Sequence, residues 1–409
     1  MNLTLWMLTF VNLICYVDRY IITAVAPKVE IEFGLTHAQT GLFMSLFMVG
    51  YMLTSPLFGY FGDRKSRPLL MGAGVLIWSF ATFASGLAEL FWPLLIARAL
   101  VGVGEAAFAT LAPPFIRDCL EDGSVINRVF GVFYAAIPIG AAIGIVWGGW
   151  MADSYHWRWA FYLGAAPGFA LAAFVWKMRE PGHRVREISQ DSPYDSFTAL
   201  KSNSLFRVSV LAYTAQTFAL GGFSAWAPQY GMSVLGVSLT DSSMKIGAST
   251  VLSGLIGTLI GGKWGSCFLA ATEAKDGPEA VRAFNKFCGW TSVLATPIAF
   301  FAFKATNINE FVILLFFVQL FIFAALAPAN TAIISAVPAK MAATAFAVSI
   351  FMIHALGDVI SPPLAGFLAD RMPMPDAMQV LVLALGVSGI IWLFGARAPR
   401  HLVAGAALK

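Results

Sequence analysis

Charged residues are scarce in this sequence. Lysine, arginine, aspartate and glutamate make up 12% of the 409 residues, whereas soluble domains carry about 25%. Hydrophobic residues make up 58%, and apolar runs of about 20 residues, the length that spans a bilayer, recur along the chain. The composition excludes an ordinary soluble domain, and the net charge of +4 reflects basic loops rather than a nucleic-acid surface. We therefore expect an all-α integral membrane protein.

Cysteine and histidine are also few, and their spacing excludes several kinds of site. The four cysteines form no CxxC pair, and the five histidines are scattered without an HExxH motif. The phosphate-binding sequence GxxxxGK[ST] is absent as well. We expect no metal, no cofactor and no catalytic residues. A membrane-embedded enzyme that acts on lipids is left as a remote alternative.

Short polar stretches separate the apolar runs into twelve expected membrane spans. They lie at residues 3–26, 38–62, 68–88, 91–116, 125–151, 158–177, 205–234, 243–268, 285–305, 309–336, 341–369 and 376–396. The longest polar stretch, "KMREPGHRVREISQDSPYDSFTALKSN", separates span six from span seven, and part of it is expected to form a short surface helix. The predicted organisation is an N-terminal half (1–178), a cytoplasmic linker (179–204) and a C-terminal half (205–409).

The loop charges predict the orientation of the chain. If both termini are cytoplasmic, 19 of the 26 lysines and arginines fall in inner loops, at inner ends of spans or in the C-terminal tail, five fall on the outer side, and two lie deep inside spans. Positive loops face the cytoplasm. The short loops and short N-terminal tail further suggest a bacterial plasma membrane.

The two halves repeat short sequences at nearly one offset. "TLAPPF" in span four matches "ALAPAN" in span ten, which pairs Pro113 with Pro328. "GWMADS" at the end of span five matches "GFLADR" at the end of span eleven, which pairs Asp153 with Asp370. Such a duplication predicts two six-helix halves related by a pseudo-two-fold axis, with a substrate site between them near the bilayer midplane.

Glycines recur every four residues in two spans. Gly140, Gly144 and Gly148 share one face of span five, and Gly257 and Gly261 share one face of span eight. Small residues at this spacing allow helix backbones to approach closely. We expect spans five and eight to pack against each other across the halves; the alternative is that each packs within its own half.

The loop "GYFGDRKSRP" resembles the signature of the major facilitator superfamily (MFS). The matching positions are Gly59, Asp63, Arg64 and Arg67. The resemblance implies that this loop is a conformational latch between the halves, with Asp118 and Arg117 at the end of span four as candidate partners.

Five further blocks resemble the spinster branch of that superfamily: "YVDRYI", "FGYFGDR", "ARALVGVGEA", "APPFI" and "FYAAIPIG". The resemblance implies a monomeric secondary transporter that works by rocker-switch alternating access. It also implies a lipid-like substrate with an anionic or zwitterionic head, such as a lysophospholipid or a sphingoid phosphate, and coupling to protons. The partners expected are therefore this substrate, protons and membrane lipids, and no nucleic acid.

Charged residues inside spans are the candidate site, because a charge at bilayer depth is costly and usually functional. With a rise of 1.5 Å per residue, Asp18 and Arg98 lie about 23 and 27 Å from the inner ends of their spans, and Glu105 about 17 Å. Asp18 and Arg19 are adjacent and point about 100° apart, so they face different neighbours. Arg19 suits a phosphate or carboxylate head group, whereas Asp18 and Glu105 are candidate proton carriers.

Span eleven carries a second candidate pair. His354 and Asp358 are four residues apart, lie about 20 and 26 Å from the inner end, and share a helix face. The predicted substrate-binding residues are thus Arg19, Asp18, Glu105 and Gln216, and the predicted proton-coupling residues are Asp18, Glu105, Arg98, His354 and Asp358. The same charges could instead form static pairs that hold helices together. An MFS carrier of a sugar, drug or small organic anion fits the same sequence features, and so does a non-transporting sensor.

Overall fold

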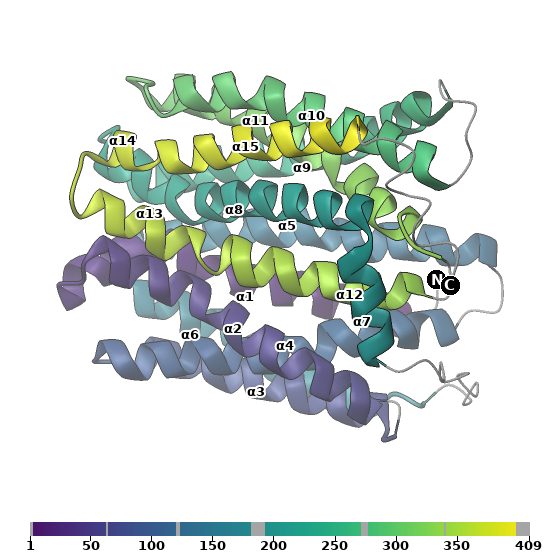
Figure 1. Cartoon of the computed structure of the whole chain (residues 1–409). Coiled ribbons are helices and arrows are strands. Elements are labelled where there is room, and N and C mark those ends of the chain that lie inside the picture. Colours follow the sequence, from purple (N-terminus) through teal and green to yellow (C-terminus); the bar gives the residue numbers. More distant parts are fainter. Residues whose placement is uncertain are drawn as a thin grey trace. The chain divides into compact units, whose positions relative to one another are not determined.

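The computed structural model describes residues 3–62, 64–119, 123–180, 193–270, 277–338 and 341–397, and in these ranges every regular element is a helix (Figure 1). The helices up to the linker are α1 (Leu3–Phe33), α2 (His37–Gly62), α3 (Arg67–Leu87), α4 (Phe91–Asp118), α5 (Gly123–Ser154) and α6 (Trp157–Trp176). The later ones are α7 (Pro193–Ser202), α8 (Ser204–Ser233), α9 (Leu239–Ala270), α10 (Gly277–Ala302), α11 (Ile308–Ser335), α12 (Ala342–Ile353), the π-helix η2 (His354–Asp358), α13 (Ser361–Ala369), α14 (Met374–Ala377) and α15 (Gln379–Ala396).

The predicted all-helical membrane fold is confirmed. Each expected span coincides with one helix or with a broken series, and ten helices among the described residues are long and apolar enough to cross a membrane. The expected short linker helix is α7, while residues 181–192 of the linker lie outside the described ranges.

The predicted end of the first span was wrong by seven residues. The helix α1 continues through Pro27 to Phe33 and ends where Gly34 adopts a φ of +61°. Pro27 is tolerated inside the helix because neighbouring membrane helices can satisfy the backbone groups that it frees. The extension carries Lys28, Glu30 and Glu32 on an ordered helical turn.

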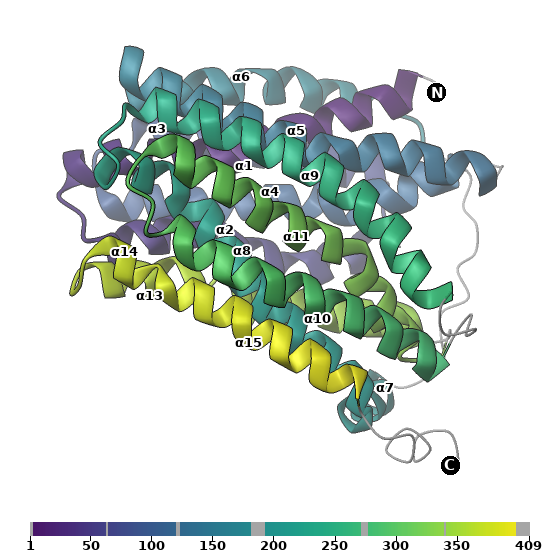
Figure 2. The same ribbon diagram turned by 90° about the horizontal axis from the view of Figure 1, so that it is seen from above.

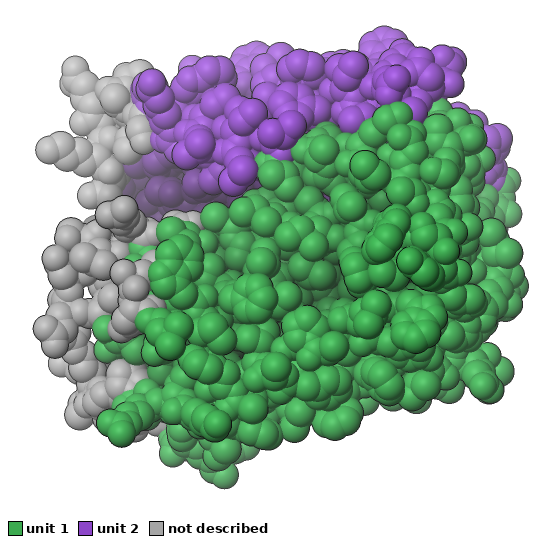
Figure 3. All heavy atoms as spheres, turned by 180° about the vertical axis from the view of Figure 1, so that it is seen from behind, with its two compact units in different colours: residues 1–186, 225–251, 362–371 green, residues 187–224, 252–361, 372–409 purple. Residues whose placement is uncertain are grey.

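The chain forms two compact units, shown in different colours in Figure 3. Unit 1 contains residues 1–186, 225–251 and 362–371, and unit 2 contains residues 187–224, 252–361 and 372–409. Unit 1 therefore includes the first six helices together with one end each of α8 and α9 and all of α13 except its first residue. The division into halves at residues 178 and 204 stays a prediction.

Each unit is built from helix pairs that lie along each other. In unit 1, α1 packs along α5, α2 along α4, and α3 against both α4 and α6. In unit 2, α10 packs between α11 and α15, as Figure 2 shows. Buried apolar side chains fill these contacts, including Trp78 and Phe108 in unit 1 and Trp392 in unit 2.

The glycine stripe of α5 packs within its own half, so the expected contact across the halves was wrong for these residues. A Cβ built on Gly140, Gly144 or Gly148 would lie 2.7, 2.3 or 2.9 Å from a carbonyl oxygen of α1. The three carbonyls belong to Leu13, Val17 and Ile21. The stripe allows α1 and α5 to approach at backbone distance.

The glycine stripe of α9 is used in the same way. A Cβ on Gly257 or Gly261 would lie 2.7 or 2.0 Å from a carbonyl oxygen of α11. The helices α5 and α9 do meet in unit 1, but through Gly149 and Gly247. The spacing of small residues indicates that a partner helix comes close and does not indicate which one.

Gly102 provides a stability test of this packing. A Cβ at Gly102 of α4 would lie only 1.8 Å from the carbonyl oxygen of Phe47 in α2, where both partners are backbone. Because neither helix can yield locally, Gly102→Ala is expected to lower the free energy of unfolding by about 2–3 kcal/mol. Thermal unfolding in detergent, followed by tryptophan fluorescence, measures the change.

Gly262→Ala is the matched control. A Cβ at this helical position would meet no atom within 4 Å. Alanine is the better helix former by up to about 1 kcal/mol, so this variant is expected to unfold at or slightly above the original temperature. Equal losses in the two variants would contradict the close approach of α2 and α4.

Candidate functional site

An ion pair joins α1 and α4 inside unit 1. Arg19 donates from Nε and Nη2 to Oε2 of Glu105, at 2.9 and 2.5 Å. The Glu105 side chain is fully buried, and that of Arg19 keeps 14% of its surface exposed. Of the two side chains, that of Arg19 is therefore the more accessible.

Aromatic rings surround the same guanidinium. The Arg19 Cζ lies 4.6, 5.1 and 5.6 Å from the ring centroids of Tyr16, Phe47 and Tyr51. A cation within about 6 Å of a ring is attracted by its negative face. These rings orient the guanidinium without saturating its N–H donors, so a bound anion could still accept hydrogen bonds from it. These three aromatic residues are not among the site residues predicted from the sequence.

Asp18 points away from Arg19, toward α6. Its side chain is fully buried, and a Cβ on Gly164 of α6 would lie 3.2 Å from Asp18 Oδ1. Neither carboxylate oxygen has a hydrogen-bond partner within standard geometry among the described residues. The two adjacent charges therefore serve different neighbours.

Arg98 is a second buried charge without a hydrogen-bond partner. Its side chain is fully buried, and none of its three nitrogens is paired within the part of the chain that the structure describes. Its guanidinium carbon lies 5.9 Å from the centroid of the Phe47 ring, on the ring that Arg19 also approaches. Buried polar atoms are nearly always paired, so Asp18 and Arg98 are exceptions that require an explanation.

A second titratable pair lies in unit 2. Nδ1 of His354 lies 3.1 and 2.9 Å from the two carboxylate oxygens of Asp358, and both side chains are about one fifth exposed. The pair spans the π-helical turn η2, which interrupts the expected continuous helix of span eleven. Gly221 of α8 allows this turn to pack closely, since a Cβ there would lie 2.8 Å from Asp358 Cα. Such π-turns occur frequently at functional sites.

Gln216 lies in unit 2 and is buried. It is 1% exposed, and its Nε2 donates to the carbonyl oxygen of Ile322 in α11 at 3.2 Å. Its Oε1 has no partner among the described residues.

The first residue of α3, directly after the loop from α2, is bound to the end of α4 and to the start of the linker. Arg67 donates from Nη1 to Asp118 at 2.8 Å and from Nε to Glu180 at 2.5 Å, and its backbone N–H donates to Glu180 at 2.7 Å. Arg64 is exposed and lies over the Tyr60 ring. Sequence reasoning missed Glu180, which follows α6 by four residues and carries no motif. Asp63 lies outside the described residues, and a Cβ built on Gly59 would make only an ordinary contact with Thr110, at 3.8 Å.

A comparison with family models and a comparison with individual proteins agree with each other. The chain matches the family model of the Major Facilitator Superfamily over residues 8–272. It is 30% identical over 442 residues to the probable sphingolipid transporter spinster homolog 1 of Arabidopsis thaliana, covering 95% of this chain and 87% of that protein. It is 32% identical over 396 residues to protein spinster homolog 1 of Bos taurus, covering 89% and 72%.

Solved structures show the same fold. The crystal structure of a bacterial homolog to the human lysosomal transporter Spinster, in an inward-facing and unoccupied conformation, matches with a TM-score of 0.83 at 20% identity. The match covers 99% of this chain and 98% of that one. The nucleoside transporter NupG matches with a TM-score of 0.73 at 13% identity.

Proposed function

Since the chain belongs to the spinster branch of the major facilitator superfamily, whose members are transporters rather than enzymes, we propose that it moves an amphiphilic lipid by rocker-switch alternating access. The proposed substrate has one acyl or sphingoid chain and an anionic or zwitterionic head, as in a lysophospholipid or a sphingoid phosphate. The relatives' description as sphingolipid transporters supports this class. We further propose that transport is coupled to protons.

The Arg19–Glu105 pair carries the proposal. Three aromatic rings lie around the Arg19 guanidinium, whose N–H donors suit a phosphate or carboxylate, and the Arg19 side chain keeps 14% of its surface exposed. Glu105 occupies Nε and Nη2 of this group. A head group therefore competes with Glu105 for Arg19, and a proton on Glu105 removes the competitor.

Charge balance explains why a proton would accompany the head group. Asp18, Arg19, Arg98 and Glu105 carry two positive and two negative charges when all are ionised, so their sum is zero. A head group of charge −1 leaves an excess negative charge in a region of low dielectric, where unpaired charge is costly. One proton on Asp18 or Glu105 restores neutrality, so proton binding and head-group binding favour each other. Arg98 then serves to balance whichever acid stays ionised.

The remaining predicted residues have supporting roles in this scheme. His354 and Asp358 are proposed as a second proton-carrying pair in unit 2, and Gln216 as a polar contact there. The loop from Gly59 to Arg67, which includes Asp63 and Arg64, is proposed as a conformational latch. The ion pairs of Arg67 with Asp118 and Glu180 support this role. We propose a monomer in a bacterial plasma membrane with both termini cytoplasmic.

Reconstitution tests the substrate class. Proteoliposomes with a pH gradient receive radiolabelled lysophosphatidylglycerol in the outer leaflet, and albumin extracts the label that has not crossed. We expect protected label to accumulate several-fold faster than in protein-free liposomes, and to lose that advantage when the gradient is collapsed. The control repeats the assay with labelled small organic acids and sugars. Movement of one of these, with no movement of the lysolipid, would refute the lipid assignment and favour an ordinary MFS carrier.

A further inference from the structure

Two aspartates that the sequence repeat pairs with each other hold the starts of two helices. Asp153, in the last turn of α5, accepts hydrogen bonds from Thr240 N at 2.7 Å and from Thr240 Oγ1 at 3.0 Å, at the start of α9. Asp370, directly after α13, accepts from the backbone N–H groups of His37 at 2.7 Å and Ala38 at 3.0 Å, at the start of α2. All these residues belong to unit 1. Each aspartate therefore caps a helix that comes from the other half of the sequence.

The two capped helices begin with the same turn. Gly34 and Gly236 both adopt positive φ, +61° and +69°, and each is followed two residues later by a hydroxyl residue. Thr36 Oγ1 accepts from the N–H of Gln39, and Ser238 Oγ accepts from the N–H of Asp241. Each hydroxyl thus caps the third N–H of its own helix, which leaves the first two without an intrahelical partner. Asp153 of α5 accepts from the second N–H of α9, and Asp370, directly after α13, accepts from the first two N–H groups of α2.

The caps lie on helix pairs that pack closely at glycine residues. Between α2 and α13, a Cβ on Gly41 would lie 2.3 Å from the carbonyl oxygen of Pro362, and one on Gly366 would lie 2.2 Å from that of His37. Between α5 and α9, a Cβ on Gly149 would lie 2.3 Å from the hydroxyl of Ser243. At the end of unit 1 that carries Gly34, here called the Gly34 end, the two sequence halves are therefore in direct contact.

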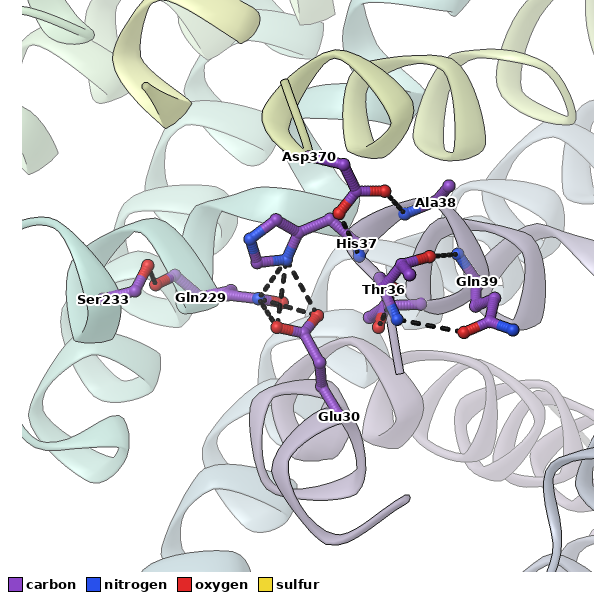
Figure 4. A network of polar contacts seen from close by, with 9 residues as sticks. Glu30, Thr36, His37, Ala38, Gln39, Gln229, Ser233 and Asp370 are labelled. Atoms are coloured by element: carbon purple, nitrogen blue, oxygen red, sulfur yellow. Dashed lines mark hydrogen bonds and ion pairs between the residues drawn. The ribbon is translucent and has the colours of Figure 1, made fainter. Parts of the chain in front are cut away.

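Further polar groups surround each cap. Lys28 of α1 lies 3.1 Å from Asp153 Oδ1. Near Asp370, Glu30 accepts from Nε2 of Gln229 in α8 at 3.0–3.1 Å and lies 3.0 Å from Nδ1 of His37, as Figure 4 shows. These flanking contacts differ between the two caps, whereas the aspartate, the glycine turn and the hydroxyl recur in both.

We propose that Asp153 and Asp370 form a symmetric pair of helix caps between the halves that holds the Gly34 end closed and is released whenever this end opens. The inference rests on the alternating-access mechanism proposed above. A carboxylate at a helix N-terminus gains both hydrogen bonds and favourable interaction with the helix dipole. Separation of α2 from α13 and of α5 from α9 breaks both caps and transfers both carboxylates to water. The caps therefore stabilise the closed state and not the open one.

Electron spin resonance distances test the proposal in the full-length protein. Spin labels at Tyr155→Cys and Val234→Cys, two exposed positions at the Gly34 end of the two halves, report its opening. The background lacks the native cysteines Cys15, Cys119, Cys267 and Cys288. Asp153→Asn and Asp370→Asn are each expected to raise the ratio of long to short distances about tenfold. Because the two caps share no atoms, the double variant is expected to raise it about a hundredfold.

Glu32→Gln is the matched control. Glu32 also lies at the Gly34 end and forms an ion pair of 2.5 Å, but its partner Arg158 belongs to the same half. This variant removes one negative charge without touching a contact between the halves, so the distance ratio is expected to stay within twofold. Asp153→Glu and Asp370→Glu keep the charge and serve as conservative variants that retain part of the closed state.

The measurement is made without substrate and at constant pH, so it does not depend on which molecule is transported. Equal distance ratios in Asp153→Asn, Asp370→Asn and Glu32→Gln, with all three proteins monodisperse and helical by circular dichroism, would overturn the capping proposal. If the aspartate variants shift the distances but no lysolipid moves in the proteoliposome assay, the capping proposal is supported and only the proposed substrate class is rejected.

Discussion

Arg19→Ala is expected to lose at least about a hundredfold in affinity for an anionic lysolipid, which corresponds to about 2.7 kcal/mol. Arg19 is the one member of the buried charge cluster with an exposed fraction, and it donates from Nε and Nη2. Charge-assisted hydrogen bonds contribute about 1.5–3 kcal/mol each, so loss of the guanidinium removes most of the head-group interaction. Binding is measured by isothermal titration with a short-chain lysophosphatidylglycerol below its micellar concentration.

Three further variants separate binding from folding. Arg19→Ala alone leaves the buried Glu105 carboxylate without its partner, which can destabilise the protein by itself. The double variant Arg19→Ala/Glu105→Gln removes both members, so its stability is expected to recover while its affinity stays low. Arg158→Ala, which removes an arginine outside the cluster, is expected to bind normally, and Arg19→Lys to lose about tenfold because the forked contact is gone. Unchanged affinity in the double variant would reject Arg19 as the head-group ligand.

Glu105→Gln is expected to bind the anionic lysolipid up to about a hundredfold more tightly than the unsubstituted protein, because glutamine removes the carboxylate that occupies Nε and Nη2 of Arg19. The amide cannot take up or release the coupled proton, so the variant is also expected to lose the response of affinity to pH that the proposed coupling requires. Isothermal titrations of both proteins at several pH values measure the affinity and its slope.

Asp18→Asn and Glu32→Gln complete this experiment. Asp18 is buried without a hydrogen-bond partner among the described residues, and its neutralisation is expected to flatten the remaining pH dependence of transport. Glu32 is a carboxylate at the helix end, bound to Arg158 and Trp157, and its replacement is expected to leave the pH profile unchanged. If Asp18→Asn and Glu105→Gln both respond to pH as the unsubstituted protein does, these acids do not carry the coupled proton.

Much of the fold can be read from the residues without coordinates. The bilayer imposes a length of about 20 apolar residues on every spanning helix, so the spans could be placed to within a few residues in most cases. The larger differences are at α1, which continues through Pro27 to Phe33, and at α10, which begins at Gly277, eight residues before the predicted start of its span. The π-turn at His354–Asp358 was also invisible, since its i, i+4 spacing fits an α-helix equally well.

The candidate site was predictable in its residues and not in its pairing. Hydropathy alone singles out Asp18, Arg19, Arg98 and Glu105, because charges are rare at bilayer depth. Which acid binds which arginine depends on the rotation of α1 against α4, and that rotation is set by the close packing of α1 on the glycines of α5. Arg19 consequently meets Glu105, while Asp18 and Arg98 remain without hydrogen bonds in the described structure.

The repeated Ala-Asp sequence also separates what the sequence determines from what only the tertiary structure decides. The residues alone reveal that Asp153 and Asp370 are equivalent, since duplication preserves local sequence. They do not reveal that each carboxylate accepts hydrogen bonds at the start of a helix from the other half. Local chemistry and span length follow from the order of the residues along the chain. Partners hundreds of positions apart follow only from how the helices pack. A small residue indicates that another helix comes close, and a buried charge indicates that a polar partner is present, but neither identifies the helix that provides it.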